Sequence, residues 1–236
     1  MPDRHRETVS PYRDLADFQR LLTDASVHDD ERVGQGYDAL KERGYFWVAV
    51  RVAAGFRRLP DGRPLQIETW ATPPAAASID RMYRLSDGSG TFAEGVARWA
   101  LVRLADGRPV RLAETPGLLE PRRFETEDAY PAGFGTLDFD LEEPDRPIMV
   151  PASGIDRNGH LNNARYWDLV FSAAAAAGLP TEPVARLEIA YRNALFAGET
   201  ALVRLRREGD GIAFCAHVVR SGIAVRAFAG RYAPRP

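Results

Sequence analysis

Apolar residues recur with a helical period near the start of the chain. Ser10 and Pro11 are typical of a helix N-terminus. An apolar stripe follows at intervals of three and four residues, formed by Leu15, Phe18, Leu22 and Ala25. The stripe ends at the charged residues 29–32, and a second apolar segment over residues 37–43 stops at Gly44. The pattern predicts one amphipathic helix followed by a short helix that ends at this glycine.

From residue 45 the pattern changes to that of strands, with β-branched and aromatic residues between turns rich in glycine, aspartate and proline. Four strands are predicted, at residues 45–59, 65–71, 77–85 and 91–104. Residues 118–147 hold several prolines and an acidic run and show no clear period. We therefore expect a linker there that crosses the surface, with at most short strand-like pieces.

The same order of elements returns after the linker. A polar loop leads into an apolar helix predicted over residues 162–177 and expected to be buried. Strands follow at residues 184–196, 200–207, 212–220 and 223–232. A repeat with a period of about 135 residues predicts two copies of one unit. We expect an α+β protein with an N-terminal domain over residues 1–117 and a C-terminal domain over residues 148–236, each a helix with an antiparallel sheet.

Composition narrows the possible partners and compartments. The 236 residues are 45% hydrophobic and 27% charged, and the formal net charge of −2 argues against nucleic acid as a partner. The single cysteine, Cys215, allows no disulfide within the chain and fits a reducing compartment. The first residues lack the apolar segment of a signal peptide, and no apolar run is long enough to cross a bilayer. We expect a cytoplasmic protein without membrane contact.

The residues most indicative of chemistry lie in the polar loop before the second long helix. The loop reads GIDRNGHLNNARYW, which places Asp156, Asn158 and His160 at every second position. In an extended segment these side chains project to one side. A carboxylate near an imidazole is a common general base, and an amide can bind a polarised carbonyl. The N–H groups at the start of the helix, near Asn162 and Asn163, would point to the same place.

A purely structural interpretation of this loop is also open. It could be a polar turn that caps a helix, with aspartate and asparagine bonding to the backbone. Asn163 in particular could equally be a helix cap. Turn chemistry does not explain His160 at this spacing, so we favour the catalytic interpretation. No spacing of Cys and His indicates a metal site. His5 and His28 lie in polar segments that we expect to be exposed. No metal or cofactor is predicted.

A second pair of potentially reactive residues lies on a predicted strand. Cys215 and His217 are two positions apart and would share one face of that strand. This spacing allows a cysteine hydrolase. A lone cysteine between Phe214 and Ala216 is more typical of a packed core, and we favour that interpretation.

Read from Asp156 to Tyr166, the pattern D-x-N-x-H-x-N-N-x-x-Y closely resembles the second-half motif of plant and bacterial acyl-ACP thioesterases. The resemblance extends over nearly the whole chain, including LQIETW at residues 65–70 and RWALV at residues 98–102. It implies a double hotdog fold, which agrees with the repeat. The implied activity is hydrolysis of the thioester that joins a fatty acyl chain to the phosphopantetheine of acyl carrier protein.

The resemblance also implies roles for single residues. Asp156, Asn158 and His160 match three catalytic residues of the family by position. His160 and Asp156 would activate a water, and Asn158 would position that water or the thioester oxygen. The helix N–H groups near Asn162 and Asn163 would stabilise the oxyanion. Whether Asp156 acts as a base or as a nucleophile stays open.

One departure from the family pattern keeps other functions open. Many members follow an aromatic–arginine pair with a glutamate that supports the histidine, and here Ala194 stands at that position after Tyr191 and Arg192. A non-catalytic protein that binds acyl chains or acyl-ACP is therefore one alternative. A hotdog enoyl hydratase is another, less favoured because its D-x-N-P-x-H motif has proline after the asparagine, where this chain has Gly159.

The resemblance implies acyl carrier protein as the partner. The last 51 residues contain nine arginines against three glutamates and one aspartate, so they could present a basic face to this acidic protein. Arginines on a strand edge could equally serve solubility. Two hotdog domains in one chain favour a monomer or a homodimer.

Overall fold

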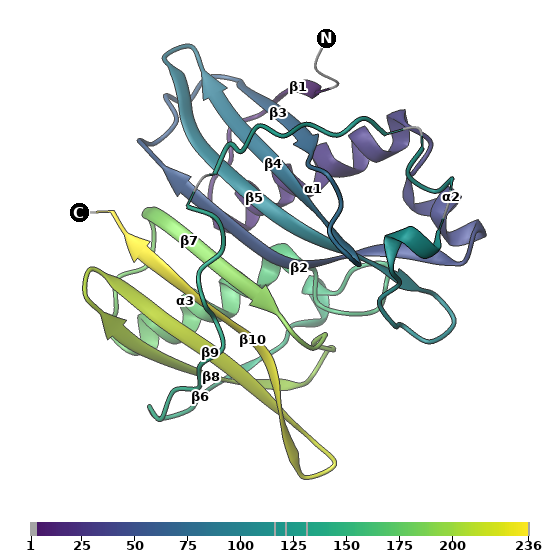
Figure 1. The fold of residues 1–236 in the computed structure, drawn as a ribbon. Coiled ribbons are helices and arrows are strands. Elements are labelled where there is room, and N and C mark those ends of the chain that lie inside the picture. Colours follow the sequence, from purple (N-terminus) through teal and green to yellow (C-terminus); the bar gives the residue numbers. More distant parts are fainter. Residues whose placement is uncertain (1–3, 116, 121, 131, 236) are drawn as a thin grey trace. The chain divides into compact units, whose positions relative to one another are not determined.

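The structure is a computed structural model that describes residues 4–115, 117–120, 122–130 and 132–235. The chain divides into two compact units. The first unit comprises Met1–Pro11 and Arg20–Gly133, and the second comprises Tyr12–Gln19 and Phe134–Pro236. Each unit contains an antiparallel sheet with helix against it, which confirms the α+β class (Figure 1).

The sheet of the first unit has the strand order β1-β3-β4-β5-β2, and every neighbouring pair is antiparallel. Its strands are β1 (His5–Val9), β2 (Tyr45–Phe56), β3 (Leu65–Ala71), β4 (Ser78–Asp87) and β5 (Gly90–Arg103). The helices near the start of the chain are α1 (Leu15–Arg32) and α2 (Tyr37–Glu42). α1 packs on this sheet, where the hydroxyls of Ser26 and Tyr83 share a buried hydrogen bond of 2.6 Å.

The sheet of the second unit has the order β7-β10-β9-β8-β6 and is also antiparallel. Its strands are β6 (Arg146–Met149), β7 (Val184–Tyr191), β8 (Thr200–Glu208), β9 (Gly211–Arg220) and β10 (Ile223–Pro234). A short 3₁₀ turn, η3 (Asn163–Arg165), leads into α3 (Tyr166–Ala176). The tight turn between β9 and β10 holds Ser221 and Gly222 at φ of +50° and +78°, the backbone that two-residue hairpins require.

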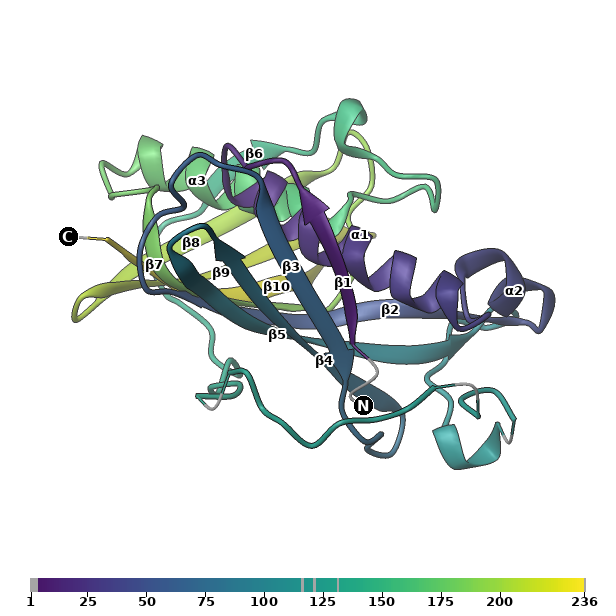
Figure 2. The same ribbon diagram turned by 90° about the horizontal axis from the view of Figure 1, so that it is seen from above.

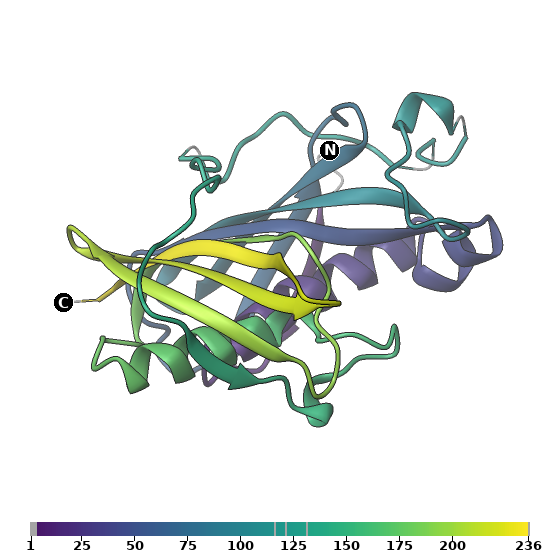
Figure 3. The ribbon, with the colours of Figure 1, turned by 90° about the horizontal axis from the view of Figure 1, so that it is seen from below.

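Two layers cover the second sheet, one on each face. On one face α3 packs its aromatic residues, with Trp167 edge-on to Phe214 at 5.6 Å and Tyr166 edge-on to Phe228 at 5.2 Å between ring centroids. Phe214 is followed along β9 by Cys215, which points the other way and packs with Leu141 of the connector. The connector before β6 therefore runs over the face opposite α3 (Figures 1 and 3). Only one face of α3 is buried, because Ala175 and Ala176 are exposed.

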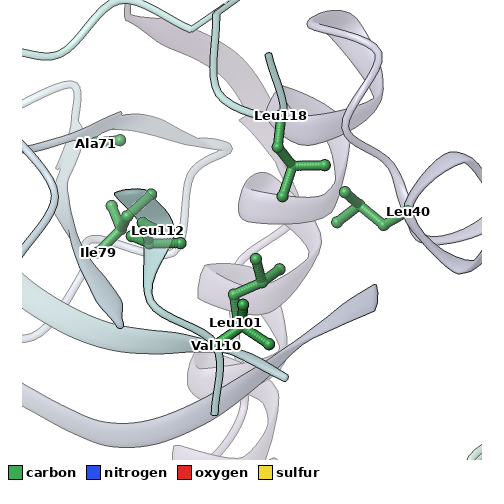
Figure 4. Close-up of a cluster of buried hydrophobic side chains, with 7 residues drawn as sticks. All are labelled: Leu40, Ala71, Ile79, Leu101, Val110, Leu112 and Leu118. Atoms are coloured by element: carbon green, nitrogen blue, oxygen red, sulfur yellow. The ribbon is translucent and has the colours of Figure 1, made fainter. Parts of the chain in front are cut away.

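The first unit has an apolar cluster where the ends of its elements meet. Figure 4 shows its buried members, which are Leu40, Ala71, Ile79, Leu101, Val110, Leu112 and Leu118. They come from α2, three strands and the segment after β5. Burying a large apolar side chain contributes about 1.5–3 kcal/mol. The segment after β5 is therefore part of the core of this unit and not only a surface crossing.

Charged residues are also buried in the first unit. Asp29 of α1 accepts hydrogen bonds from Arg81 of β4 at 2.6 Å and from Arg122 at 2.7 Å. Asp30 accepts from Arg81 at 2.6 Å and also pairs with Arg122. Gln35 accepts from Arg122 at 3.0 Å. Burial opposes ionisation of Asp29, but the two guanidinium groups outweigh it and lower the pKa of Asp29 to about 2.

Several elements differ from the prediction, among them the helix predicted over residues 162–177, which is α3 at Tyr166–Ala176 after the turn η3. β1 was not predicted, because its charged sequence HRETV lacks the apolar residues that mark a buried strand. α1 begins at Leu15 and not at Pro11, because the carboxylate of Asp14 caps it by accepting the N–H of Asp17 at 2.7 Å. β7 ends at Tyr191, five residues before the predicted end.

Among the residues that the structure describes, no helix is both long and apolar enough to cross a membrane.

Candidate active site

The polar loop before α3 is a closed turn. Ile155 and Leu161 form a bridge across it, the Asp156 N–H donates to the His160 carbonyl at 2.9 Å, and the Gly159 N–H donates to the Asp156 carbonyl at 3.0 Å. Gly159 has φ of +81°, a conformation that glycine adopts without strain. Asp156 and His160 are therefore brought together by a turn, and not by the extended segment that the sequence suggested.

Asp156 and His160 lie close without a direct hydrogen bond. The Asp156 Oδ1 is 3.9 Å from the His160 Nδ1, beyond hydrogen-bond range. The same Oδ1 accepts the backbone N–H of Asn158 at 2.8 Å, and the His160 Nδ1 lies 3.4 Å from the Leu161 carbonyl. The side chains of Asp156 and His160 are 21% and 29% exposed. A water molecule can therefore reach both.

The predicted oxyanion residues lie at the turn from loop to helix. Asn162 is the cap here, because its Oδ1 accepts the Ala164 N–H at 3.0 Å. The N–H of Asn162 is also engaged, by the Gly154 carbonyl at 2.9 Å. The N–H of Asn163 has no hydrogen-bond partner within the described ranges. Asn163 is therefore not the cap, and its N–H is the group at this position that could bind an oxyanion.

A buried network missed by the sequence analysis holds this turn in place. The Tyr191 hydroxyl donates to the Asn163 carbonyl at 3.2 Å and accepts from the Gln19 side-chain amide at 2.5 Å. Gln19, 2% exposed, also accepts the indole N–H of Trp167 at 2.8 Å. Gln19 lies in the part of α1 that belongs to the second unit. Its only sequence signal is an amide within a helix that also carries an apolar stripe, so its role could not be predicted.

Position 194, where the family pattern has a glutamate, holds Ala194, whose backbone carbonyl accepts a hydrogen bond. Arg220 donates to the Ala194 carbonyl at 2.5 Å and to Glu199 at 2.7 and 2.9 Å. Hydrogen bonding to Arg220 lowers the pKa of Glu199. Asn193 points its amide at the Arg226 carbonyl, 2.8 Å away. Arg220 thus brings Glu199, which follows this segment in the chain, next to the Ala194 backbone.

Tyr166 lies among these charged groups. Burial raises the pKa of Tyr166 to about 12, and the charges of Arg220, Asp156 and Glu199 all act on its hydroxyl. Its ring packs edge-on to that of Tyr191 at 5.0 Å. The motif tyrosine thus connects the loop to both the Gln19 network and the Arg220–Glu199 pair.

The strand pair Cys215 and His217 offers no comparable site. Cys215 is fully buried, and burial raises the pKa of its thiol to about 11. The thiol donates to Asp140 at 3.3 Å. A thiol that stays protonated at neutral pH is a poor nucleophile. These features favour a structural role for Cys215.

The arginines of the second unit are largely paired with acidic residues. Arg204 pairs with Asp145 at 2.6 Å, Arg226 with Asp140 at 3.4 Å, and Arg231 donates to Glu208 at 2.9 Å. The acidic run of the connector supplies several of these partners. The second unit therefore presents less free positive charge than its arginine count indicates.

Part of the chain matches a known family model. Residues 141–225 match the family model of the acyl-ACP thioesterase C-terminal domain. No curated protein sequence matches the chain. An acyl-ACP thioesterase from Bacteroides thetaiotaomicron shares 18% identity and a TM-score of 0.80, over 98% of this chain and 96% of that one. The 12:0-ACP thioesterase from Umbellularia californica shares 16% identity and a TM-score of 0.83, over 100% and 98%.

A dehydratase is a weaker structural match. The MaoC-like dehydratase from Phytophthora capsici shares 12% identity and a TM-score of 0.50, over 80% of this chain and 69% of that one. At such identities structural likeness establishes the fold, which is the predicted double hotdog. The chain is thus similar to acyl-ACP thioesterases in two ways, through the family model matched by residues 141–225 and through the fold of solved members over nearly its whole length.

Proposed function

We propose that this protein hydrolyses the thioester of a fatty acyl-[acyl carrier protein] to a free fatty acid and the carrier protein. The observation that carries this proposal is the closed turn that brings Asp156 within 3.9 Å of His160. The turn lies inside the segment that matches the thioesterase domain. Both side chains are partly exposed, so water and a thioester can reach them. The carrier protein with its acyl-phosphopantetheine is the partner that this reaction requires, and we expect a monomer or a homodimer.

In the proposed reaction His160 is the general base. A water between Asp156 and His160 gives a proton to the imidazole as its oxygen bonds to the thioester carbonyl carbon. The carboxylate of Asp156 stabilises the imidazolium that forms. The C–S bond then breaks, and the proton on His160 passes to the departing thiolate. A fatty acid and the phosphopantetheine thiol leave, so atoms and charge balance without a covalent intermediate.

Two other groups have roles in this proposal. The side-chain amide of Asn158 positions the water or the thioester oxygen. The N–H of Asn163 donates to the oxyanion, since it has no other hydrogen-bond partner in the described part of the chain. The Asn163 carbonyl is fixed by Tyr191, which orients the peptide group that follows Asn163. The Asn162 side chain accepts the N–H of that same peptide group, from Ala164. The peptide group that carries the Asn163 N–H is held on its carbonyl side, where Asn162 accepts the Arg165 N–H at 2.8 Å.

A binding protein without turnover is the second candidate. Ala194 favours it, because no carboxylate stands at the family position and the Ala194 carbonyl bonds to Arg220 instead. The gap of 3.9 Å between Asp156 and His160 also leaves the imidazole without a direct carboxylate bond. A protein that only binds acyl chains has no evident need of Asp156, Asn158 and His160 together, so we favour the hydrolase.

Thiol release from a panel of acyl-ACP and acyl-CoA thioesters of different chain length tests the proposal. We expect release from acyl-ACP that exceeds release from the matching acyl-CoA, with one range of chain length preferred. Binding of acyl-ACP without any thiol release would replace the hydrolase with the binding protein. Hydration of an enoyl thioester with the C–S bond intact would identify the hydratase alternative.

A further inference from the structure

Two histidines and a glutamate of the first unit converge outside the candidate active site. His5 and Glu7 lie on β1, and His28 lies on α1. One ligand atom from each residue can be chosen so that all three lie within 4.8 Å of one another. The Glu7 Oε2 is 2.7 Å from the His28 Nδ1 and 3.5 Å from the His5 Nε2. Figure 2 shows β1 at the edge of its sheet, next to β3.

Strand geometry separates these residues from the arginines beside them. Successive side chains of a strand point to opposite faces, so His5 and Glu7 share one face of β1 while Arg4 and Arg6 share the other. Both arginines pair with Glu68 of β3, Arg4 at 3.1 Å and Arg6 at 2.5 Å. The face that carries His5 and Glu7 is the one that meets His28 of α1. Two imidazoles and a carboxylate therefore meet there without these guanidinium groups.

Two buried polar atoms of the cluster lack a hydrogen bond. Among the described residues, His5 Nε2 and Glu7 Oε1 make no hydrogen bond, although neither atom is exposed to solvent. Buried polar atoms almost always have a partner. Both atoms carry lone pairs when the imidazole is neutral at this nitrogen and the carboxyl is ionised. A cation between them would satisfy both, whereas another acceptor would not.

A further acidic residue lies beside the cluster. Asp24 lies one turn before His28 on α1, on the same face. The His28 side chain is 51% exposed, against 16% for His5 and 21% for Glu7. An ion could therefore enter from the His28 side and keep water in its remaining positions.

We propose that His5, Glu7 and His28 bind one divalent transition-metal ion, with zinc best matching the donor set, and that the ion ties β1 to α1. Two imidazoles and one carboxylate are a common protein ligand set for zinc. β1 is a short edge strand that pairs only with β3 among the described strands. The ion would fasten this strand to the helix. The proposed role is structural and independent of thioester hydrolysis.

The chain contains four histidines, and a second cluster around one of them serves as a control for the proposed site. Asp140, Cys215 and His217 form another cluster of potential ligands. Arg204 and Arg226 lie 3.5 and 3.4 Å from Asp140, so a cation there would meet two positive charges. The Asp140→Ala variant removes the exposed carboxylate of that cluster and leaves His5, Glu7 and His28 in place.

Zinc titration of the chelator-treated full-length protein, against a competing coloured chelator, tests the proposal. We expect one zinc per chain for the wild type and for Asp140→Ala. Affinity should fall by more than about 100-fold in His28→Ala, since losing a group that only orients a ligand already costs about 10–100-fold. The proposal would be overturned if His28→Ala bound zinc as tightly as the wild type does, if Asp140→Ala lost zinc binding, or if the wild type bound no zinc.

Amide hydrogen exchange separates metal binding from a folding defect. His28 is exposed enough that His28→Ala should keep the wild-type exchange rates without metal. Zinc should slow exchange of the β1 amides in the wild type and leave them unchanged in His28→Ala. Equal slowing in both proteins would show that zinc acts elsewhere and would contradict the proposed site.

Discussion

The side-chain amide of Gln19 donates a hydrogen bond to the Tyr191 hydroxyl at 2.5 Å, although 172 positions separate them in the chain. The same hydroxyl donates to the Asn163 carbonyl at 3.2 Å. Gln19 also accepts the Trp167 indole N–H. This network ties the start of α1 to the turn that holds the candidate active site. The position of the Asn163 peptide therefore depends on residues far from the motif.

Removing the Tyr191 hydroxyl should impair turnover through the Asn163 peptide. In Tyr191→Phe the Asn163 carbonyl loses its donor, so we expect kcat to fall about tenfold with KM nearly unchanged, as for a small displacement of a reacting group. Stability should fall by about 1–3 kcal/mol, because the bonds to the Asn163 carbonyl and to the buried Gln19 amide are both lost. Tyr232→Phe is the matched control, because the Tyr232 hydroxyl donates to the Pro180 carbonyl. Equal kcat losses in the two variants would refute a positioning role.

Asp156 has a structural and a chemical contribution that substitutions can separate. Asp156→Asn keeps an oxygen that can accept the Asn158 N–H but removes the negative charge near His160. We expect it to fold normally and to lose about 10²-fold or more in kcat. Asp156→Ala should lose similar activity and some stability in addition. Full activity in Asp156→Asn would show that Asp156 only stabilises the turn, as the purely structural interpretation of the loop holds.

A carboxylate at position 194 should partly restore the family arrangement. We expect Ala194→Glu to raise kcat by up to about tenfold, because a nearby negative charge favours the imidazolium that forms on His160. Arg220, which bonds to the Ala194 carbonyl, competes for the new carboxylate and limits the gain. Ala194→Gln has the same shape without the charge and should leave kcat unchanged. A similar gain from glutamine would contradict the electrostatic explanation.

The buried charges of the first unit should matter for stability. Arg81→Met leaves Asp29 and Asp30 with fewer partners, and breaking a buried ion pair costs about 3–5 kcal/mol. Arg103→Met breaks the exposed pair with Asp106 and should cost less than about 1 kcal/mol. Denaturant unfolding at neutral pH measures both. Equal costs would show that the buried cluster contributes no more than a surface pair.

The stability contributed by Asp29 should depend on pH in a defined direction. Its pKa is lowered from 3.8 to about 2 on folding, mainly by Arg81 and Arg122 against the opposing effect of burial. As the pH falls, the carboxylate of Asp29 is protonated in the unfolded chain before it is protonated in the folded chain. Its contribution to stability is therefore complete above about pH 4 and is lost as the pH falls through 2. The stability difference between wild type and Arg81→Met should narrow over the same range. A difference that stays constant from pH 5 to 2 would contradict this linkage.

The sequence predicted the elements with strong patterns. β3 was predicted to the residue, and α2, β8, β9 and β10 were confirmed within two residues, because apolar alternation and glycine turns specify them locally. β1 was missed because its side chains pair by charge and not by apolar burial. β7 ends early, and the two residues Asn193 and Ala194 after it bond to Arg226 and Arg220, contacts that no local pattern contains.

The motif located the candidate site, but not its geometry. Asp156 and His160 were expected to be close, and the structure explains this by a turn with Gly159 at positive φ. Gln19 and Arg220 act through contacts over long sequence separations, so one sequence could not reveal them. The convergence of His5, Glu7 and His28 escaped prediction for the same reason.

Hydrolysis of acyl-ACP by the wild type beside His160→Ala and His217→Ala tests the central claim most directly. Both variants lose a histidine of the second unit, but only His160 lies next to Asp156 in the candidate site. We predict that His160→Ala lowers kcat by about 10²–10⁴-fold while still binding acyl-ACP, and that His217→Ala keeps wild-type turnover. Undiminished thiol release by a folded His160→Ala protein would contradict the site and the mechanism together.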